Sequence, residues 1–405
     1  YAKWPPDALR AQAVAARSWW ICASLVLLLG GCASVREVVP GPVGGLLYPP
    51  RPSRSVRVAI LRNAADVDVT VNGPGVMYDS FTGKQIRRFL SLREAGITVD
   101  RYGRLALNGR VLGTRRLMIY PDIPKTLYVD GTCYRGKIDI ISLPGSKLTV
   151  VNTLPLEEYL MGVVPKETYA KWPPDALRAQ AVAARSFAVH HMLNSTHADY
   201  SLIAPMHQQY GGASAEDPRT TRAVLDTEGE VMMYNGRVLC AFFHASCGGR
   251  TEDARNVFPN VGAYPPRTTS SYSKGTPHHA WNYSVAGANV LEKLARHGKD
   301  LGGPLSSVTV TRRFASGRVA DIRFASRSRA VSMTGEDCRR ILGYDNVRST
   351  LFNVRLRGGR VYFRGRGWGH GVGLCQWSSL GMANDGMDYR EILTCFYPDV
   401  HFHRL

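Results

Sequence analysis

The stretch from Val56 to Val151 consists of short apolar runs separated by turn signals. Runs rich in Val, Ile, Leu and Tyr, such as VRVAIL, VDVTVNG and LYVDG, are split by Asn-Gly, Tyr-Gly, Asp-Gly and Pro-Gly pairs. This spacing is typical of antiparallel hairpins. Helical patterns begin only after Pro155. We therefore predict an α+β fold, in which an antiparallel β-rich N-terminal part precedes a mixed α+β domain.

Glu167 is the residue on which the functional interpretation depends. A helix that opens at Pro155 is expected to end near Gly162, and Glu167 follows in a short segment after the apolar pair Val163 and Val164. A carboxyl group beside these apolar residues and the adjacent proline is partly desolvated, which raises its pKa. The segment predicts a single general acid that protonates a leaving group.

An alanine-rich helix is predicted over about residues 175–192, after a Pro-Pro pair. Its small side chains allow close packing against a neighbour. Gln180, Arg185 and Ser186 are embedded in this helix. Gln180 and Arg185 are five positions apart and point in different directions. The pattern leaves open whether each lies on a solvated face or lines a site.

Residues 364–382, RGRGWGHGVGLCQWSSLGM, begin with alternating glycines. One side of such a strand or loop carries no side chains, so another backbone or a ligand can approach closely. Trp368 and His370 occupy the opposite phase, and Gln376 follows. Packing alone is one explanation of the glycines, and we favour a sugar-binding cleft. The spacing does not fit a nucleotide-binding glycine motif.

The N-terminal residues are interpreted separately from the fold. Residues 1–18 repeat residues 169–186 letter for letter, which we treat as an artificial duplication. Residues 19–31 form an apolar run too short to span a bilayer, and we predict a lipoprotein signal peptide that is cleaved before a lipidated Cys32. An ordinary signal peptide or an uncleaved anchor is the alternative. Residues 32–55 are rich in Pro and Gly and predict a flexible tether.

The chain is strongly basic, with a formal net charge of +19. Such a field attracts nucleic acid, anionic lipid or an acidic wall polymer. Predicted export favours the last two, and we expect no nucleic-acid partner. Cys240, His244 and Cys247 have a spacing that zinc could use, but we favour a structural or disulfide role. No cofactor is predicted, with zinc as the alternative.

Three blocks of the sequence resemble the family of stage II sporulation protein D and the amidase enhancer LytB. The first runs from YRG at residues 134–136 through VVNTLPLEEYLMGVVPKE and WPPDALRAQAVAARSFA. The second is QQYGG at residues 208–212 with AVLDTEGEVMMYNGRVLCAFFHASCGGRTED. The third joins SMTGEDCRRILGYDNVRSTLF to GRGWGHGVGLCQWSSLGMANDGMDYREILTCFYPDV. Together they cover most of residues 128–400, in order and at family-like spacing.

The resemblance implies a peptidoglycan-active domain over residues 128–405, preceded by the β-rich region 56–127. Family enzymes are lytic transglycosylases that cut between N-acetylmuramic acid and N-acetylglucosamine, prefer strands stripped of stem peptides and leave 1,6-anhydro ends. Their catalytic glutamate falls on Glu167. One carboxyl group suffices because the 6-hydroxyl of the sugar replaces the second carboxylate of an ordinary glycosidase. The alternative is a non-catalytic wall-binding module that stimulates an amidase.

The resemblance also implies partners and further site residues. The partners are glycan strands, the membrane through a lipid on Cys32, and a wall amidase; the protein would then act at the outer face of the cell envelope, in wall remodelling or sporulation. Glu252 is a rival acid. Some members bind zinc through a Cys and His cluster before the QQYGG-like segment, where this chain has histidines without a cysteine. The residues expected to bind substrate are Gln180, Arg185, Gln209, Tyr210, His244, Thr251, Glu252, Trp368, His370 and Gln376.

Overall fold

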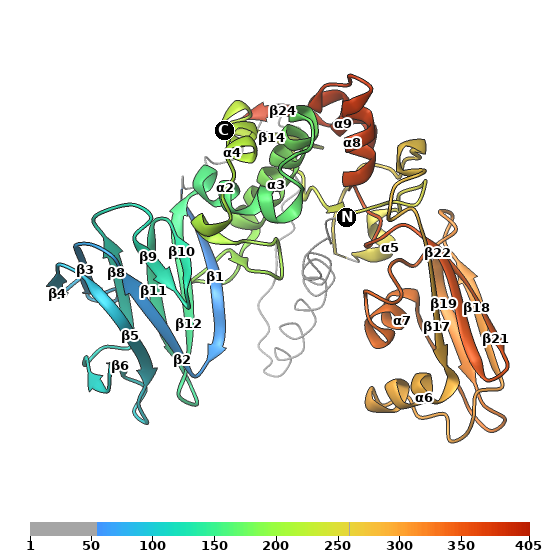
Figure 1. Ribbon diagram of the computed structural model, residues 1–405, viewed down its shortest axis with the longest axis horizontal. Coiled ribbons are helices and arrows are strands. Elements are labelled where there is room, and N and C mark those ends of the chain that lie inside the picture. The colour runs from blue at the N-terminus through green and yellow to red at the C-terminus, as the bar shows by residue number, and fades with distance from the viewer. Residues whose placement is uncertain (1–54, 259) are drawn as a thin grey trace, which may run out of the picture.

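The computed structural model describes residues 55–258 and 260–405 (Figure 1). The duplicated segment, the predicted signal peptide, Cys32 and most of the predicted tether lie outside these residues. In the part described, the chain combines antiparallel sheets with helices, which confirms the α+β prediction. Two β-rich lobes lie at opposite ends of the molecule, and a helical layer lies between them (Figure 1).

The N-terminal lobe contains two sheets that enclose one apolar core. Its strands alternate buried and exposed positions, as in β2, where Val67, Val69 and Val71 point into the core. The seven-stranded sheet has the order β13 (Leu202–Ile203), β1 (Ser55–Ala64), β12 (Lys147–Pro155), β11 (Lys137–Leu143), β8 (Arg116–Pro121), β3 (Gly75–Asp79) and β4 (Gln85–Phe89). The six-stranded sheet has the order β10 (Thr132–Tyr134), β9 (Leu127–Val129), β2 (Asp66–Val71), β5 (Leu92–Val99), β6 (Leu105–Leu107) and β7 (Arg110–Val111).

The β-rich lobe extends beyond the expected boundary at residue 127. β12 pairs with β1 in antiparallel register, with Val151 opposite Ala59, and β11 pairs with both β12 and β8. Two of the central strands of the larger sheet therefore come from the region that was expected to belong to the next domain. Short strands and hairpins predict this kind of sheet, but they do not show which strands complete it.

The helical layer surrounds the alanine-rich helix. The second core packs α3 between its neighbours and buries both the small residues and the polar residues of this helix. A small sheet joins the C-terminus to this layer, because β24 (His401–Arg404) pairs with β14 (Glu230–Tyr234), which also pairs with β15 (Arg237–Val238). The helices are α2 (Leu156–Glu167), α3 (Pro174–Asn194), α4 (Pro218–Asp226), α8 (Gln376–Asn384) and α9 (Tyr389–Phe396).

The first helix does not stop near Gly162, as expected, but continues to Glu167 with Pro165 inside it. Gly162 is needed for close approach rather than for termination: a Cβ there would lie 2.7 Å from the carbonyl oxygen of Gly212 and 2.7 Å from the ring of Tyr210. The carbonyl of Gly162 accepts a hydrogen bond from Gly211 N at 3.1 Å. Glu167 is therefore the last residue of a helix rather than part of a loop.

The second β-rich lobe lies in the chain between β16 (Phe243–His244) and β23 (Leu374–Cys375), which pair in parallel. It is called the third lobe below, because it follows the N-terminal lobe and the helical layer. Its core includes Trp281, Phe324 and Phe363. The expected single domain over residues 128–405 thus contains a second β-rich lobe. One sheet has the order β17 (Ala280–Ala286), β22 (Arg360–Arg366) and β21 (Phe352–Arg357), the other β18 (Ser307–Arg313), β19 (Val319–Ala325) and β20 (Ala330–Thr334), and both pack with α6 (Gly287–Arg296) and α7 (Gly335–Leu342).

No helix within residues 55–258 or 260–405 has the length and apolar character needed to cross a bilayer.

Candidate active site

Glu167 lies where the helical layer meets the segment of residues 208–212. Its side chain is only 2% exposed. Its Oε1 accepts a hydrogen bond of 2.7 Å from the backbone N–H of Gln209. Burial raises the pKa of the Glu167 carboxyl to about 8, although the Gln209 N–H and the charge of Lys166 act in the opposite direction. Glu167 is therefore largely protonated at neutral pH, and it is a proton donor rather than a permanent carboxylate.

Helix α8, near the C-terminus, fixes the backbone of this glutamate. Gln376, the first residue of α8, donates from Nε2 to the backbone carbonyl of Glu167 at 2.9 Å and to Oε1 of Gln180 at 3.1 Å. The structure thus brings together Glu167 and three residues expected to bind substrate, Gln180, Gln209 and Gln376. Within the described residues, Nε2 of Gln180 and Nε2 of Gln209 are buried donors without a hydrogen-bond partner. A hydroxyl-rich ligand could satisfy such donors.

An aromatic cluster, defined as Tyr169, Trp172, His278, Trp368 and Trp377, adjoins Glu167. Tyr169 follows Glu167 by two positions and Trp377 follows Gln376 directly. The ring centroids are 5.4 Å apart for Trp172 and Trp377, 6.3 Å for Tyr169 and Trp377, and 4.6 Å for His278 and Trp368. Aromatic faces bearing polar groups suit an amphipathic ring such as a pyranose.

Polar atoms of this cluster are also left without partners in the part of the chain that the structure describes. They are Nε1 of Trp368, Nε1 of Trp377 and Nδ1 of His278. Burial, together with the charge of Arg348, lowers the pKa of His278 to about 4, so that this imidazole is neutral at physiological pH. Of the cluster, only Trp368 was identified from the sequence. The position of Tyr169 and Trp172 directly after Glu167 was the signal that could have found the others.

Arg185 was expected to bind substrate, and the structure contradicts this. Its guanidinium is fully buried and ion-paired with Glu157 at 2.7 Å. It also donates to the carbonyl oxygens of Val224 at 3.0 Å and Glu230 at 3.2 Å. These contacts occupy the fork of the side chain, so Arg185 ties α3 to α2, α4 and β14 and has no donor left for a ligand.

Tyr210 holds the segment that carries Gln209 through both its hydroxyl and its ring. Its hydroxyl donates to Oδ1 of Asn152 at 2.7 Å. Its ring packs against Tyr134 and Tyr159, with centroids 5.7 and 4.9 Å away. Burial keeps the pKa of the Tyr210 hydroxyl well above its usual range. The expected substrate role is therefore replaced by a positioning role, because this anchor sets the place of the Gln209 N–H.

The alternating glycines form a turning loop rather than a flat strand. β22 ends at Arg366, and the next four glycines of the series have positive φ. At Gly373 the φ is 68°, and a Cβ would lie 2.1 Å from the carbonyl oxygen of Phe242. The space beside this glycine is filled by the protein's own backbone. Packing therefore explains the glycines themselves, and the expected sugar-binding cleft beside them stays a prediction that depends on Trp368 and Gln376.

This packing engages both ring nitrogens of His370 and one ring nitrogen of His244. Both ring nitrogens of His370 are hydrogen-bonded to backbone, with Nε2 at 3.0 Å from Phe243 O and Nδ1 accepting from Val372 N at 3.0 Å. Nδ1 of His244 lies 3.0 Å from Val372 O, and its buried Nε2 has no partner among the described residues. Burial lowers the pKa of both imidazoles. The expected substrate role of His370 is contradicted, because it fixes the loop.

Thr251 and Glu252 are structural as well. The hydroxyl of Thr251 donates to Thr268 O at 3.1 Å and accepts from Thr268 N at 2.7 Å. Glu252 accepts from Asp253 N at 2.8 Å and Asn256 Nδ2 at 3.0 Å through Oε1, and from Ser316 Oγ through Oε2. Both carboxylate oxygens of Glu252 are thus satisfied by neutral donors, which makes it a poor rival acid.

The cysteines in the described part of the chain, Cys133, Cys240, Cys247, Cys338, Cys375 and Cys395, are free thiols. Cys375 Sγ accepts a hydrogen bond from Cys247 N at 3.2 Å, and Cys240 Sγ lies 4.0 Å from Nε2 of His191. Within residues 55–258 and 260–405, no group of three His, Cys, Asp or Glu side chains is arranged to hold a metal ion. His244 and Cys247 therefore do not form a ligand set with Cys240.

Comparison with known proteins places the chain in a family. Residues 144–234 match the SpoIID family, described as stage II sporulation protein, and residues 267–373 match a domain of unknown function, DUF8618. The chain belongs to the SpoIID/LytB family. The matched SpoIID segment contains Glu167, α3 and Gln209, whereas DUF8618 corresponds to the third lobe.

Individual relatives cover different parts of the chain. An uncharacterized protein of Brachyspira hyodysenteriae is 29% identical over 351 residues, which span 85% of this chain and 92% of that protein. Stage II sporulation protein D of Bacillus subtilis is 28% identical over 263 residues, 61% of this chain and 74% of that protein. The amidase enhancer of Bacillus subtilis is 25% identical over 283 residues, 59% of this chain and 39% of that protein.

Proposed function

We propose that the protein is a lytic transglycosylase that cleaves the bond between N-acetylmuramic acid and N-acetylglucosamine in peptidoglycan, with Glu167 as its acid and base. The observation that carries the proposal is the buried carboxyl group of Glu167 beside the aromatic cluster, whose pKa is raised to about 8 by this burial. A single acid is what this reaction needs, whereas most glycosidases need two carboxyl groups.

The chemistry follows from the state of this group. Glu167 donates its proton to the glycosidic oxygen as the bond from that oxygen to the anomeric carbon breaks. The resulting carboxylate is held by the Gln209 N–H. It then accepts the proton of the muramic acid 6-hydroxyl as that oxygen bonds to the anomeric carbon, which yields the 1,6-anhydro end and restores the acid. A site with little water favours this internal attack over hydrolysis.

The test is digestion of purified, peptide-stripped glycan strands, followed by mass analysis of the new ends. Glu167→Gln keeps the shape of the side chain and removes the acid, so anhydro-ended products should disappear. Glu158→Gln is the matched control, because Glu158 lies on the same helix and is partly exposed near Arg135. Products that persist in Glu167→Gln would exclude this glutamate as the acid.

The alternative is a wall-binding protein that stimulates an amidase without cleaving glycan. Its support is the similarity to the amidase enhancer over 59% of this chain. The same digestion separates the two functions when a wall amidase is added. Stimulation of amide cleavage by wild type and Glu167→Gln alike, with no anhydro ends from either protein, would favour the enhancer.

A cell-wall role is consistent with the family relatives, and it requires a location outside the cytoplasm. We propose export and lipidation at Cys32, based on the apolar run that precedes this cysteine. Labelling of cells with a radioactive fatty acid should mark the wild-type protein. Cys32→Ser should abolish the label and release the protein from membranes, and an unchanged label would overturn the assignment.

A further inference from the structure

The positive charge of the chain is concentrated in the third lobe. The segment 267–373 has 19 Lys and Arg against 6 Asp and Glu, a formal net charge of +13, whereas the whole chain has +19. Two thirds of the net charge thus belong to about a quarter of the sequence. Charge of one sign gathered on one lobe points to an anionic partner for that lobe.

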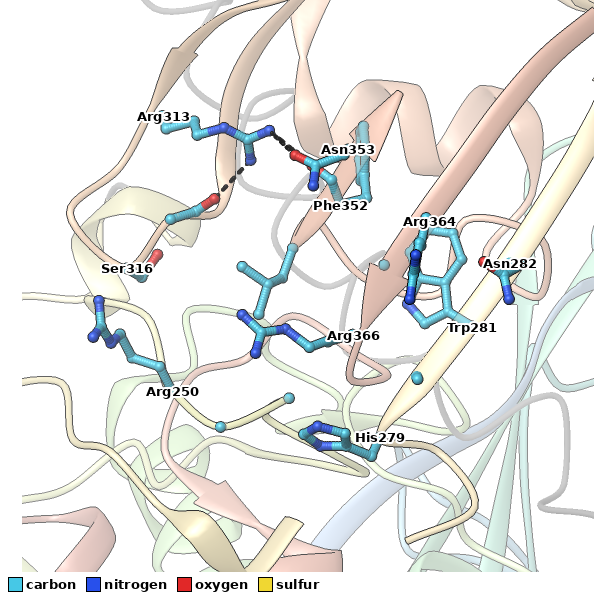
Figure 2. A pocket seen from close by; sticks show the side chains of 16 residues that line it. Arg250, His279, Trp281, Asn282, Arg313, Ser316, Phe352, Asn353, Arg364 and Arg366 are labelled. Carbon is cyan, nitrogen blue, oxygen red and sulfur yellow. Dashed lines mark hydrogen bonds between the residues drawn. The ribbon is translucent and has the colours of Figure 1, made fainter. Parts of the chain in front are cut away.

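A pocket of about 790 Å³ opens on this lobe beside β22. Figure 2 shows arginines from separate segments around it: Arg250 from the loop after β16, Arg313 from the end of β18, and Arg364 and Arg366 from β22. Asn282 and Asn353 also line the pocket, and its lining contains no Asp or Glu. In a folded protein, so many arginines around one depression without a carboxylate leave a strong positive potential.

These arginines keep their charge uncompensated. In the part described, none of the four forms an ion pair with a carboxylate, although many other arginines of the chain do. Arg313 is held by neutral acceptors, Gly317 O at 2.8 Å, Phe352 O at 3.0 Å and Oδ1 of Asn353 at 2.8 Å (Figure 2). Arg250 donates to Ala315 O at 3.3 Å. Neutral contacts fix the position of a guanidinium and leave its charge free for a ligand.

The pocket continues along the sheet into a second depression of about 580 Å³, which shares Asn282, Asn353 and Arg364 with the first. The strand register explains the shared lining, since Arg364 stands opposite both asparagines. One step further along the same face, Tyr362 stands between Ser284 and Arg355. Arginines therefore alternate with amides and hydroxyls over an elongated surface. This composition suits an extended polymer that carries both anionic groups and hydroxyls.

We propose that this arginine groove, defined as Arg250, Arg313, Arg355, Arg364 and Arg366, binds glycan strands through the lactyl carboxylates of N-acetylmuramic acid. The inference rests on the proposed function. In a strand that carries stem peptides, the carboxyl group of each lactyl substituent forms an amide bond with the peptide and is therefore uncharged. Removal of the peptide leaves one carboxylate for each disaccharide, which a guanidinium binds through paired hydrogen bonds. The groove would thereby select stripped strands.

The groove lies next to the candidate active site along the chain. His279 lines the pocket and His278 belongs to the aromatic cluster. Arg366 lines the pocket, and Trp368 of the cluster follows two residues later. Gly367 N donates to His279 O at 2.9 Å, which ties the two segments together. A strand held in the groove therefore has a short path to the aromatic rings beside Glu167.

A membrane surface fits this lobe less well. The arginines surround a depression, whereas a membrane meets a flat or protruding face. None of the large hydrophobic side chains that are exposed in the described residues lies between residues 267 and 373. Binding to a bilayer usually combines basic charge with exposed apolar groups. We therefore assign the groove to a polymer and make lipid an outcome of the test.

The test measures binding of the full-length Glu167→Gln protein, so that cleavage does not interfere. The probes are peptide-stripped glycan strands, the same strands with their carboxylates amidated, strands that retain stem peptides, poly(glycerol phosphate) and vesicles of phosphatidylglycerol. We expect stripped strands to bind best and amidation to weaken binding by at least about tenfold. Arg364→Ala combined with Arg366→Ala should cause a similar loss.

Arg323→Ala combined with Arg327→Ala is the matched control, because it removes the same charge from exposed positions of the same lobe that do not line the pocket. This control should change the affinity by less than about twofold. Equal binding of amidated and stripped strands would overturn the proposal, as would tighter binding to poly(glycerol phosphate) or vesicles. Anhydro products from wild type are scored separately, so failure of the groove leaves the role of Glu167 intact, and failure of catalysis leaves the binding comparison valid.

Discussion

The side chain of Gln376 is hydrogen-bonded to the backbone carbonyl of Glu167, at 2.9 Å, across 209 positions of sequence. The same amide nitrogen reaches Oε1 of Gln180 on α3 at 3.1 Å. Helix α8 thereby fixes the end of α2, which carries the carboxyl group of Glu167. Gln376 does not touch that carboxyl group, so in the proposed reaction it is a positioning residue.

Replacement of Gln376 by Ala should lower kcat more than it changes KM. The end of α2 loses its restraint, and displacement of a reacting group by about 1 Å can cost on the order of a hundredfold in rate. Steady-state kinetics on stripped strands would measure both constants. Ser379→Ala is the control, since it removes a buried hydrogen bond within α8, to Cys375 O at 3.1 Å, without contact to Glu167. An equal loss of kcat in both variants would reduce Gln376 to a stability role.

The rate of cleavage should depend on pH through Glu167. Burial raises the pKa of this carboxyl to about 8, and only its protonated form can act as the acid. We expect kcat/KM to fall above pH 8 by about tenfold for each pH unit. A profile measured on stripped strands between pH 5 and pH 10 would show this limb. A fall centred near pH 4.5 would mean that the acid is not desolvated in solution.

The free energy of unfolding should also depend on pH through Glu167, and it should fall as the pH rises. The folded state keeps the proton of Glu167 up to about pH 8, whereas the unfolded chain loses it near pH 4.5. Between these values the folded state binds more protons, so wild type loses stability as the pH rises, by up to about 1.4 kcal/mol for each pH unit. Glu167→Gln lacks this loss. The variant should gain thermal stability relative to wild type between pH 5 and pH 8, and a constant difference would refute the raised pKa.

Much of the site could be predicted because it depends on local segments. The short β runs predicted the antiparallel sheets, the Pro-Pro pair predicted α3, and the family blocks contain Glu167, Gln209 and Gln376. The substrate role that was expected for Arg185 could not be judged from local segments. Helical periodicity assigns a solvated face to α3, but residues 179–189 of this helix are buried on all sides, so Gln180 and Arg185 are buried for different reasons. Gln180 meets Gln376, whereas Arg185 meets Glu157.

The glycine loop and the third lobe could not be predicted for a related reason. Alternating glycines indicate close approach, but only the tertiary structure shows that the approaching atom at Gly373 is the carbonyl oxygen of Phe242. The strands between Ala280 and Arg366 are individually ordinary, and their pairing into a separate lobe depends on contacts across long separations. The arginines of the groove lie on four separate segments, the loop after β16 and the strands β18, β21 and β22, so the sequence does not show that they cluster.

Arg185 should matter for stability and little for chemistry. Arg185→Met removes the partner of Glu157 and the donor to the carbonyls of Val224 and Glu230. Breaking such a buried pair costs about 3 kcal/mol or more. Arg178→Met on the same helix breaks a partly exposed pair with Asp226 and should cost about 1 kcal/mol or less. Denaturant unfolding would compare the two, and a loss of kcat/KM in folded Arg185→Met at low temperature would restore its site role.

The aromatic cluster should contribute to glycan affinity through Trp377. This ring contacts Trp172, Tyr169 and His278 and follows the residue that positions Glu167. Trp377→Ala should weaken binding of stripped strands to the Glu167→Gln protein by about 1 kcal/mol, or roughly fivefold, while Trp377→Phe should retain most of the affinity because it keeps an aromatic face. Tyr120→Ala, at an exposed aromatic residue of the N-terminal lobe, is the control. Calorimetric titration would rank the variants. The cluster and the arginine groove use different chemistry, so salt separates their contributions. Added salt should weaken the contribution of the arginines to glycan affinity and leave the effect of Trp377→Ala unchanged. A salt-sensitive effect of Trp377→Ala would mean that the ring acts by shaping the groove rather than by stacking on the sugar.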